Sequence, residues 1–181
     1  MDIYKQKLTR LQNEILRILY INSGKELNQR EIAKKLRVSP TAVSKSLNLL
    51  EKENLIVIKK QRNMNLNLVE FNTDNLEMID MKRVDNLKMV YESKIIRFLE
   101  EIFTGCAIIL FGSYSRGEDT IDSDIDIAVI GSKYKEIDLR KFENMLERKI
   151  TINFYNSFKD IHKNLKSNIL SGILLSGSIE L

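Results

Sequence analysis

The first fifty residues place apolar side chains at three- and four-residue spacing, which is typical of helices with one buried face. We expect one helix over residues 4–22, a second over 28–38 and a third from 39 onward. Asn28 is a favoured cap residue for the second helix, and Pro40 suits the first turn of the third. The buried stripe of the third helix consists of Val43, Leu47 and Leu50.

The outward face of the third helix is small, polar and basic. It consists of Thr41, Ser44, Lys45 and Asn48. Hydroxyl, amide and ammonium groups on such a helix can reach base edges and phosphates in the major groove of duplex DNA. This face is therefore a candidate for DNA recognition.

Two strand patterns, LIVIKK and NMNLNLVEF, follow the third helix, and the tip between them is basic. The tip contains Lys59, Lys60, Gln61 and Arg62. A basic hairpin at this place is typical of a wing that lies against DNA, and we expect Lys60 and Arg62 to bind it. The segment REIAKKLRVSPTAVSKSLNLLEKENLIVIKK resembles the winged-helix transcriptional regulators, which implies a DNA-binding domain over residues 1–72. Winged helices also serve protein contacts, so docking of a protein partner is the alternative.

A helical pattern without Gly or Pro runs from Asp74 to Phe103. We expect a long connector helix over residues 73–103. Its apolar side chains could pair with a second copy in a homodimer, which would suit two DNA half-sites, or its later half could pack on the second domain. The sequence leaves both arrangements open.

The run CAIILF is typical of a buried strand, and it leads directly into Gly112-Ser113. Such a turn lets the backbone approach a ligand and presents N–H groups and a hydroxyl to phosphates. In TIDSDIDIAVI, Asp124 and Asp126 flank Ile125 at the start of a second strand, where alternation puts both carboxylates on one face. Two such carboxylates repel each other unless a cation lies between them, and hard oxygen ligands suit Mg²⁺.

The combined segment GSYSRGEDTIDSDIDIAVI resembles the signature of the polymerase-β-type nucleotidyltransferase superfamily, in particular its minimal nucleotidyltransferases. The resemblance implies a small domain over residues 104–181 that binds ATP or another nucleoside triphosphate with Mg²⁺. The nucleotide-binding residues that it implies are Gly112, Ser113 and Arg116, and the residues implied in catalysis and metal binding are Asp124 and Asp126. For Arg116, a plain surface position on the helix is the alternative.

Active members of that superfamily use a third carboxylate on a later strand. The only suitable strand pattern here is KITINFYN, in which Thr151 or Asn153 takes the expected place. Neither side chain can act as a carboxylate base, and losing a general base costs roughly 10²–10⁴ in rate. The sequence therefore predicts nucleotide binding with impaired turnover.

Four other polar residues are given no role in the chemistry. Asp119 and Asp122 are interpreted as loop carboxylates, and His162 as an exposed residue in a polar helical stretch. Cys106, the single cysteine, is interpreted as a buried strand residue. One cysteine excludes an intramolecular disulfide and a thiolate metal cluster.

Charge is spread unevenly along the chain. Residues 1–70 carry 14 Lys or Arg and 7 Asp or Glu, whereas residues 71–181 carry 15 and 18. A basic first part fits a module that binds a polyanion. No run reaches the roughly 18 apolar residues of a membrane span, and the start lacks the apolar core of a signal peptide. We therefore expect a cytoplasmic protein with no membrane partner.

Together these patterns predict an α+β protein with an N-terminal winged helix, a long connector helix and a small mixed-sheet nucleotidyltransferase-like domain. The leading hypothesis is a DNA-binding transcriptional regulator whose second domain binds nucleotide and Mg²⁺. The alternative is an active enzyme that transfers a nucleoside monophosphate from ATP to a hydroxyl of a small molecule or of a protein, as in toxin–antitoxin pairs. A third hypothesis gives the second domain a role in interaction and dimerisation only.

Overall fold

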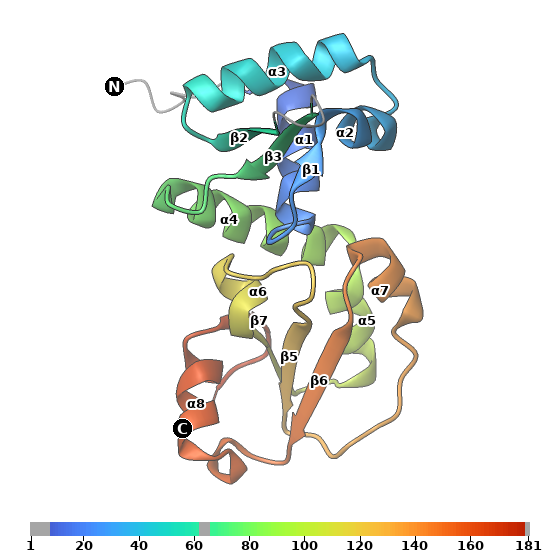
Figure 1. The fold of residues 1–181 in the computed structure, drawn as a ribbon. Helices are drawn as coiled ribbons and strands as arrows, with labels where there is room; N and C mark the ends of the chain where they lie inside the picture. Colours follow the sequence, from blue (N-terminus) through green and yellow to red (C-terminus); the bar gives the residue numbers. More distant parts are fainter. Residues whose placement is uncertain (1–7, 62–65, 180–181) are drawn as a thin grey trace, which may run out of the picture. The chain divides into compact units, whose positions relative to one another are not determined.

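The chain folds into two compact units, whose boundary lies between Met78 and Ile79 (Figure 1). The structure is a computed structural model, and it describes residues 8–61 and 66–179. Each unit has its own sheet, of three strands in the first and four in the second. Both are accompanied by helices, so the predicted α+β class is confirmed.

The first unit begins with three helices: α1 (Arg10–Ile21), α2 (Gln29–Leu36) and α3 (Pro40–Lys52). The expected Asn28 cap is present, because Asn28 accepts from the backbone N–H groups of Arg30 and Glu31. Pro40 begins α3 as expected, and Ser39 caps this helix. The first helix starts later than the apolar pattern suggests. Thr9 forms a capping box with Gln12, so α1 begins at Arg10.

A small antiparallel sheet completes this unit. Its strands are β1 (Leu27–Asn28), β2 (Ile56–Gln61) and β3 (Leu66–Phe71), in the order β1-β3-β2. The expected wing is thus the β2–β3 hairpin. Of its expected tip, Lys59, Lys60 and Gln61 belong to β2, and Arg62 lies outside the described residues. Ile32, Val43, Leu47 and Val69 are buried under this sheet and the helices. Each such side chain stabilises the fold by about 1.5–3 kcal/mol relative to an exposed one.

The expected single helix over residues 73–103 is two helices, α4 (Leu76–Glu92) and α5 (Ile95–Ile102). Lys94 adopts a left-handed conformation with φ of 67°, and this ends the regular helix. The Ser93 hydroxyl donates to the Val90 carbonyl and accepts from the Ile95 N–H group, so the break has its own hydrogen bonds. From Ile79 onward both helices belong to the second unit.

The sheet of the second unit has the order β6-β5-β4-β7. Its strands are β4 (Ala107–Phe111), β5 (Ile125–Ile130), β6 (Ile150–Tyr155) and β7 (Ile173–Ser176). Strand β5 runs parallel to β6 and antiparallel to β4, while β7 is antiparallel to β4, which makes the sheet mixed. The remaining helices are α6 (Gly112–Arg116), α7 (Arg140–Leu146), the 3₁₀ turn η1 (Phe158–Asp160) and α8 (Lys163–Leu170).

Each face of this sheet has its own apolar core. Helices α5 and α7 cover one face, where Leu99 and Leu146 pack on Ile127, and α8 covers the other, where Ile169 packs on Ile109 (Figure 1). The interpretation of Cys106 as a buried strand residue is wrong, because this thiol is half-buried and precedes β4. Within the part of the chain that the structure describes, no helix is both long and apolar enough to cross a membrane.

Candidate functional site

The candidate site of the second unit starts where β4 ends. Phe111 is the register partner of Asp126 across the β4–β5 pair, so the next residue, Gly112, lies beside the Asp126 side chain. Gly112 has φ of 76°, and a β-carbon built on it would overlap Asp126 Oδ2 and lie 3.2 Å from its Cγ. Only glycine satisfies both the left-handed backbone and this close approach.

The two carboxylates of the Asp-x-Asp pair differ in environment. Asp124 is exposed just before β5, whereas Asp126 is half-buried within the strand. Burial raises the pKa of Asp126 above its ordinary value, and the negative charge of Asp124 raises it further. Ionisation of Asp126 is therefore less favourable than that of a solvated aspartate, and a nearby positive charge would offset this effect.

Strand β6 decides which residue lies next to these carboxylates. In the parallel register Asp126 is opposite Thr151, and Asn153 is opposite Ala128. The Thr151 hydroxyl donates to Asp124 Oδ2 at 3.3 Å. Of the two residues proposed for the place of a third carboxylate, Thr151 is thus the one beside the pair. Within residues 8–61 and 66–179 there is no group of three or more His, Cys, Asp or Glu side chains that could hold a metal ion.

The other residues predicted to bind nucleotide lie on α6. Ser113 is half-buried directly after Gly112. Arg116 lies at the end of α6, where its Nε donates to Glu118 Oε2 at 2.7 Å and its Nη1 donates to Asn168 Oδ1 at 3.1 Å. The guanidinium therefore links the loop after α6 to α8, and a phosphate contact would have to share it with these two side chains.

A cavity of about 590 Å³ adjoins Asp124. It lies between the loop before β5 and the end of α7 with the residues that follow it, and both Asp122 and Asp124 line it. Asp122 is exposed and so fits its interpretation as a loop carboxylate. His162 is exposed in front of α8, as expected.

Sequence reasoning missed one buried polar cluster behind this loop. Asp119 is a loop residue, but it is only 1% exposed, and the fully buried Lys82 of α4 lies beside it. Asn86 and Arg148 complete the cluster. No local signal reveals it, because a lysine in a polar helix is ordinarily solvated.

The first unit carries the candidate DNA-binding residues on α3. Thr41, Lys45 and Asn48 are exposed there, and Ser44 is half-buried, opposite the buried stripe of Val43 and Leu47. In the wing, Lys60 is exposed and Arg62 lies outside the described residues. Lys59 differs from Lys60, since its ammonium pairs with Glu26 at 2.9 Å and with Glu70 at 2.6 Å.

Both halves of the chain match known families. The family described as "Nucleotidyltransferase domain" matches residues 92–175, and the MarR family matches residues 6–63. These matches fit the mixed sheet with its Gly-Ser and Asp-x-Asp residues and the three helices with their hairpin. The first part of the chain is thus similar to the MarR family and the second part to nucleotidyltransferase domains, in agreement with the two sequence resemblances.

Among solved structures, the chain is similar to the S. aureus MepR–DNA complex, with 22% identity and a TM-score of 0.40 over 52% of this chain and 77% of that chain. It is also similar to the zinc-responsive MarR family member ZitR of Lactococcus lactis. That alignment has 24% identity and a TM-score of 0.34, and it covers 54% of this chain and 76% of the other. Among curated proteins, none matches the chain.

Proposed function

We propose that this protein is a cytoplasmic, DNA-binding transcriptional regulator whose second unit binds a nucleoside triphosphate together with Mg²⁺. The observation that carries the proposal is the packing of Asp126 on Gly112, next to Asp124, in a domain of nucleotidyltransferase type. The nucleotide then acts as a ligand that changes DNA affinity.

The donor set at the Asp pair fits Mg²⁺. Two carboxylates and the hydroxyl of Thr151 are hard oxygen donors, and Mg²⁺ is usually held by one or two protein carboxylates together with phosphate oxygens. Asp124 and Asp126 would hold the ion, which neutralises charge on the phosphates. Gly112 and Ser113 would lie against those phosphates, because a glycine without a side chain leaves the backbone open to them.

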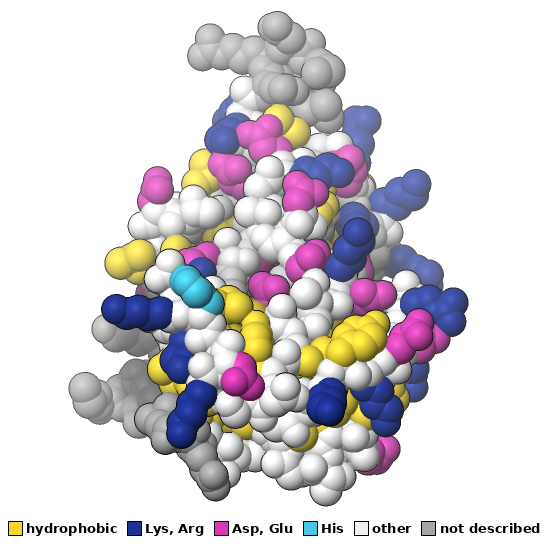
Figure 2. Space-filling view, turned by 90° about the horizontal axis from the view of Figure 1, so that it is seen from below, with side chains coloured by type: hydrophobic (Ala, Val, Ile, Leu, Met, Phe, Trp, Pro, Cys, Tyr) yellow, Lys and Arg dark blue, Asp and Glu magenta, His cyan; other side chains and the backbone are white. Residues whose placement is uncertain are grey.

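The exposed face of α3 supports the DNA-binding part. Thr41 and Asn48 can hydrogen-bond to base edges, while Lys45 supplies charge toward phosphates. In contrast, the face shown in Figure 2 has Lys and Arg interspersed with Asp and Glu.

A homodimer that reads two half-sites completes this proposal, and sedimentation of the protein with and without a DNA duplex tests it.

The nucleotide part is tested by titrating the full chain with ATP and Mg²⁺ in a calorimeter. Binding should disappear in the double variant Asp124→Asn/Asp126→Asn. The matched control is Asp138→Asn, which neutralises an exposed carboxylate paired with Arg140 on the same unit. Unchanged ATP binding by the Asp124/Asp126 variant, or equal loss in the control, would contradict the assignment.

Coupling to DNA is tested by measuring duplex affinity with and without Mg²⁺ and a nucleotide. If the nucleotide changes DNA affinity by some factor, DNA must change nucleotide affinity by the same factor. A regulator of the proposed kind shows both shifts. Equal DNA affinity in the two conditions would leave two independent binding modules and remove the regulatory role of the nucleotide.

One observation favours an active transferase as the second candidate function. The cavity beside Asp124 has a volume of about 590 Å³, which offers room for an acceptor. In such a reaction the acceptor oxygen bonds to the α-phosphorus, pyrophosphate leaves, and a base takes the hydroxyl proton. Incubation with α-phosphate-labelled ATP and cell lysate would reveal label on a protein or small molecule, and the Asp124→Asn/Asp126→Asn variant should abolish that label.

A further inference from the structure

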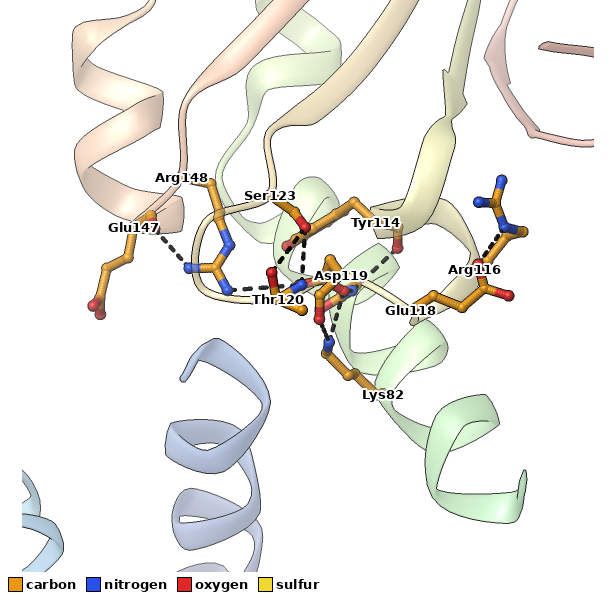
Figure 3. A network of polar contacts seen from close by, with 10 residues as sticks. Lys82, Tyr114, Arg116, Glu118, Asp119, Thr120, Ser123, Glu147 and Arg148 are labelled. Atoms are coloured by element: carbon orange, nitrogen blue, oxygen red, sulfur yellow. Dashed lines mark hydrogen bonds and ion pairs between the residues drawn. The ribbon is translucent and has the colours of Figure 1, made fainter. Parts of the chain in front are cut away.

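A buried ion pair lies behind the loop that carries Asp124. Lys82 Nζ is 2.9 Å from Asp119 Oδ1, and the two side chains are 0% and 1% exposed. Lys82 also donates to the backbone carbonyl of Asp119, so one ammonium holds both the side chain and the main chain of this residue (Figure 3). Neither group can exchange its partner for bulk water while the unit stays folded.

Two more side chains converge on Asp119. Asn86 Nδ2 donates to Asp119 Oδ1 at 2.7 Å and to the Tyr114 carbonyl at 3.1 Å. Arg148 Nη2 lies 3.6 Å from Asp119 Oδ2 on its other side. Asp119 therefore joins α4, the last turn of α6 and the segment after α7 at one point.

The loop from Asp119 to Asp124 has little freedom beyond this anchor. Thr120 N–H donates to Ser123 Oγ at 2.9 Å (Figure 3). Ser123 N–H in turn donates to the Thr120 carbonyl at 3.0 Å. On the other side of Asp124, Ile125 N–H donates to the Lys149 carbonyl at 2.8 Å. Asp124 is held between a closed turn and the first hydrogen bond of β5.

Gly117, like Gly112, allows a close approach, because its lack of a side chain lets the end of α6 lie against the backbone of α4. Its φ is 76°, and a β-carbon there would lie 2.9 Å from the Arg83 backbone nitrogen. The end of α6 therefore packs on the backbone of α4 one residue beyond Lys82. Contacts from α4 thus hold Tyr114, Gly117 and Asp119 in the segment that follows the Gly112 turn.

Stability alone is a poor explanation for the ion pair. A buried pair must offset the desolvation of both charges, and replacing such a pair with well-packed neutral residues is often neutral or stabilising. In some proteins a buried pair instead specifies one geometry, because a displacement leaves a charge uncompensated. The segment that this pair anchors is the loop that ends in Asp124.

We propose that Asp119, together with Lys82, is a positioning residue that fixes the loop over residues 117–124 so that Asp124 and Asp126 can share a divalent cation. This inference rests on the proposed function, because it assigns a role toward the same metal and nucleotide. Asp119 does not contact the ligand in this role. It acts through the Thr120–Ser123 turn on the placement of the Asp124 carboxylate.

The test removes the Lys82 and Asp119 charges together, which keeps the net charge of the cluster with Arg148 unchanged, whereas removing one of them would change it. In Lys82→Met/Asp119→Asn, we expect the affinity for Mn²⁺ with ATP, followed by electron paramagnetic resonance of Mn²⁺, to fall at least tenfold. The matched control is Lys88→Met/Glu92→Gln, which removes an exposed pair with side chains 62% and 57% exposed on the same helix. A core variant of the same unit, Leu99→Ala, shows what general destabilisation does to the affinity.

Unchanged Mn²⁺–ATP affinity in the folded double variant would overturn the positioning role, as would an equal loss in Leu99→Ala. Hydrogen exchange of the backbone amides of residues 120–125 gives a second measurement that needs no nucleotide. Faster exchange there, with the rest of the unit protected as before, supports the positioning role, and unchanged exchange overturns it. If the unmodified protein binds no Mn²⁺–ATP, the proposed function fails, and the exchange measurement still decides whether Asp119 fixes the loop.

Discussion

The carboxylate of Asp126 lies in the space that a β-carbon at position 112 would need. Gly112 and Asp126 are fourteen positions apart, but the β4–β5 register brings them together, with Phe111 opposite Asp126. The contact joins the two motifs of the candidate site. Asp126 can take this position only because Gly112 has no side chain.

Gly112→Ala should therefore lower stability and abolish nucleotide binding. The left-handed backbone costs a non-glycine residue about 1–3 kcal/mol, and the added methyl group must also displace Asp126. Urea unfolding and ATP titration measure the two effects. Gly105→Ala is the matched control, with φ of 80° and no described atom within 4 Å of the built β-carbon. It should show the backbone cost with normal nucleotide affinity, and loss of affinity in this control would refute the argument.

Asp126→Asn should stabilise the metal-free protein near neutral pH. Burial, and then the charge of Asp124, raises the pKa of Asp126 above its ordinary value of 3.8. A carboxyl with a raised folded-state pKa contributes stability that is present below the unfolded-state pKa and is lost as the pH rises through the folded-state pKa. The advantage of the Asn variant should thus appear at neutral pH and vanish below pH 3.8.

Thermal unfolding from pH 3 to pH 8 without divalent ions measures this dependence. The pKa of Asp138 is lowered to about 2, chiefly by the hydrogen bond from Arg140, so Asp138→Asn should show no stabilisation at neutral pH. Because protons compete with a cation for Asp126, Mg²⁺ affinity of the unmodified protein should fall as the pH falls through the raised pKa. A pH-independent difference between Asp126→Asn and the unmodified protein would contradict the electrostatic argument.

Thr151→Asp should tighten the binding of Mg²⁺ or Mn²⁺ about tenfold or more. Thr151 lies opposite Asp126 and donates to Asp124, so a carboxylate at this place would add a third negative charge to the pair. Without metal the same charge should destabilise the unit, because like charges repel, and added Mg²⁺ should reverse the loss. Thr151→Val, which adds no charge, is the control. Equal metal affinity in the Asp and Val variants would exclude Thr151 from the site.

Lys45→Ala should weaken duplex binding and reduce the dependence of log affinity on log salt by about one unit. Lys45 is exposed on the polar face of α3, where its ammonium can neutralise one phosphate. Fluorescence anisotropy at several salt concentrations measures the slope. Lys141→Ala removes an exposed lysine on α7 of the other unit and should leave the slope unchanged. If log affinity depends on log salt equally in Lys45→Ala and the unmodified protein, the proposed contact of α3 with DNA is contradicted.

The sequence determined the elements whose ends are set locally. Asn28 with Glu31 and Ser39 with Pro40 are signals within one helical turn, and the structure has α2 and α3 where these residues predict them. The apolar run after Asp124 likewise predicted a strand, and β5 is buried on both faces of the sheet. The Gly-Ser and Asp-x-Asp motifs likewise led to the nucleotidyltransferase family, although the roles of their residues stay predictions.

Only the tertiary structure decided which residues meet across the sheet and behind it. In the sequence, Thr151 and Asn153 are equally suited to the place of a third carboxylate on the predicted strand. The β5–β6 register alone puts Thr151 beside Asp124. Lys82 and Asp119 are 37 positions apart, and their burial depends on how α4 packs against the loop before β5. Periodicity reports which face of an element is buried, but the partner of a buried charge is set by long-range packing that no local pattern encodes.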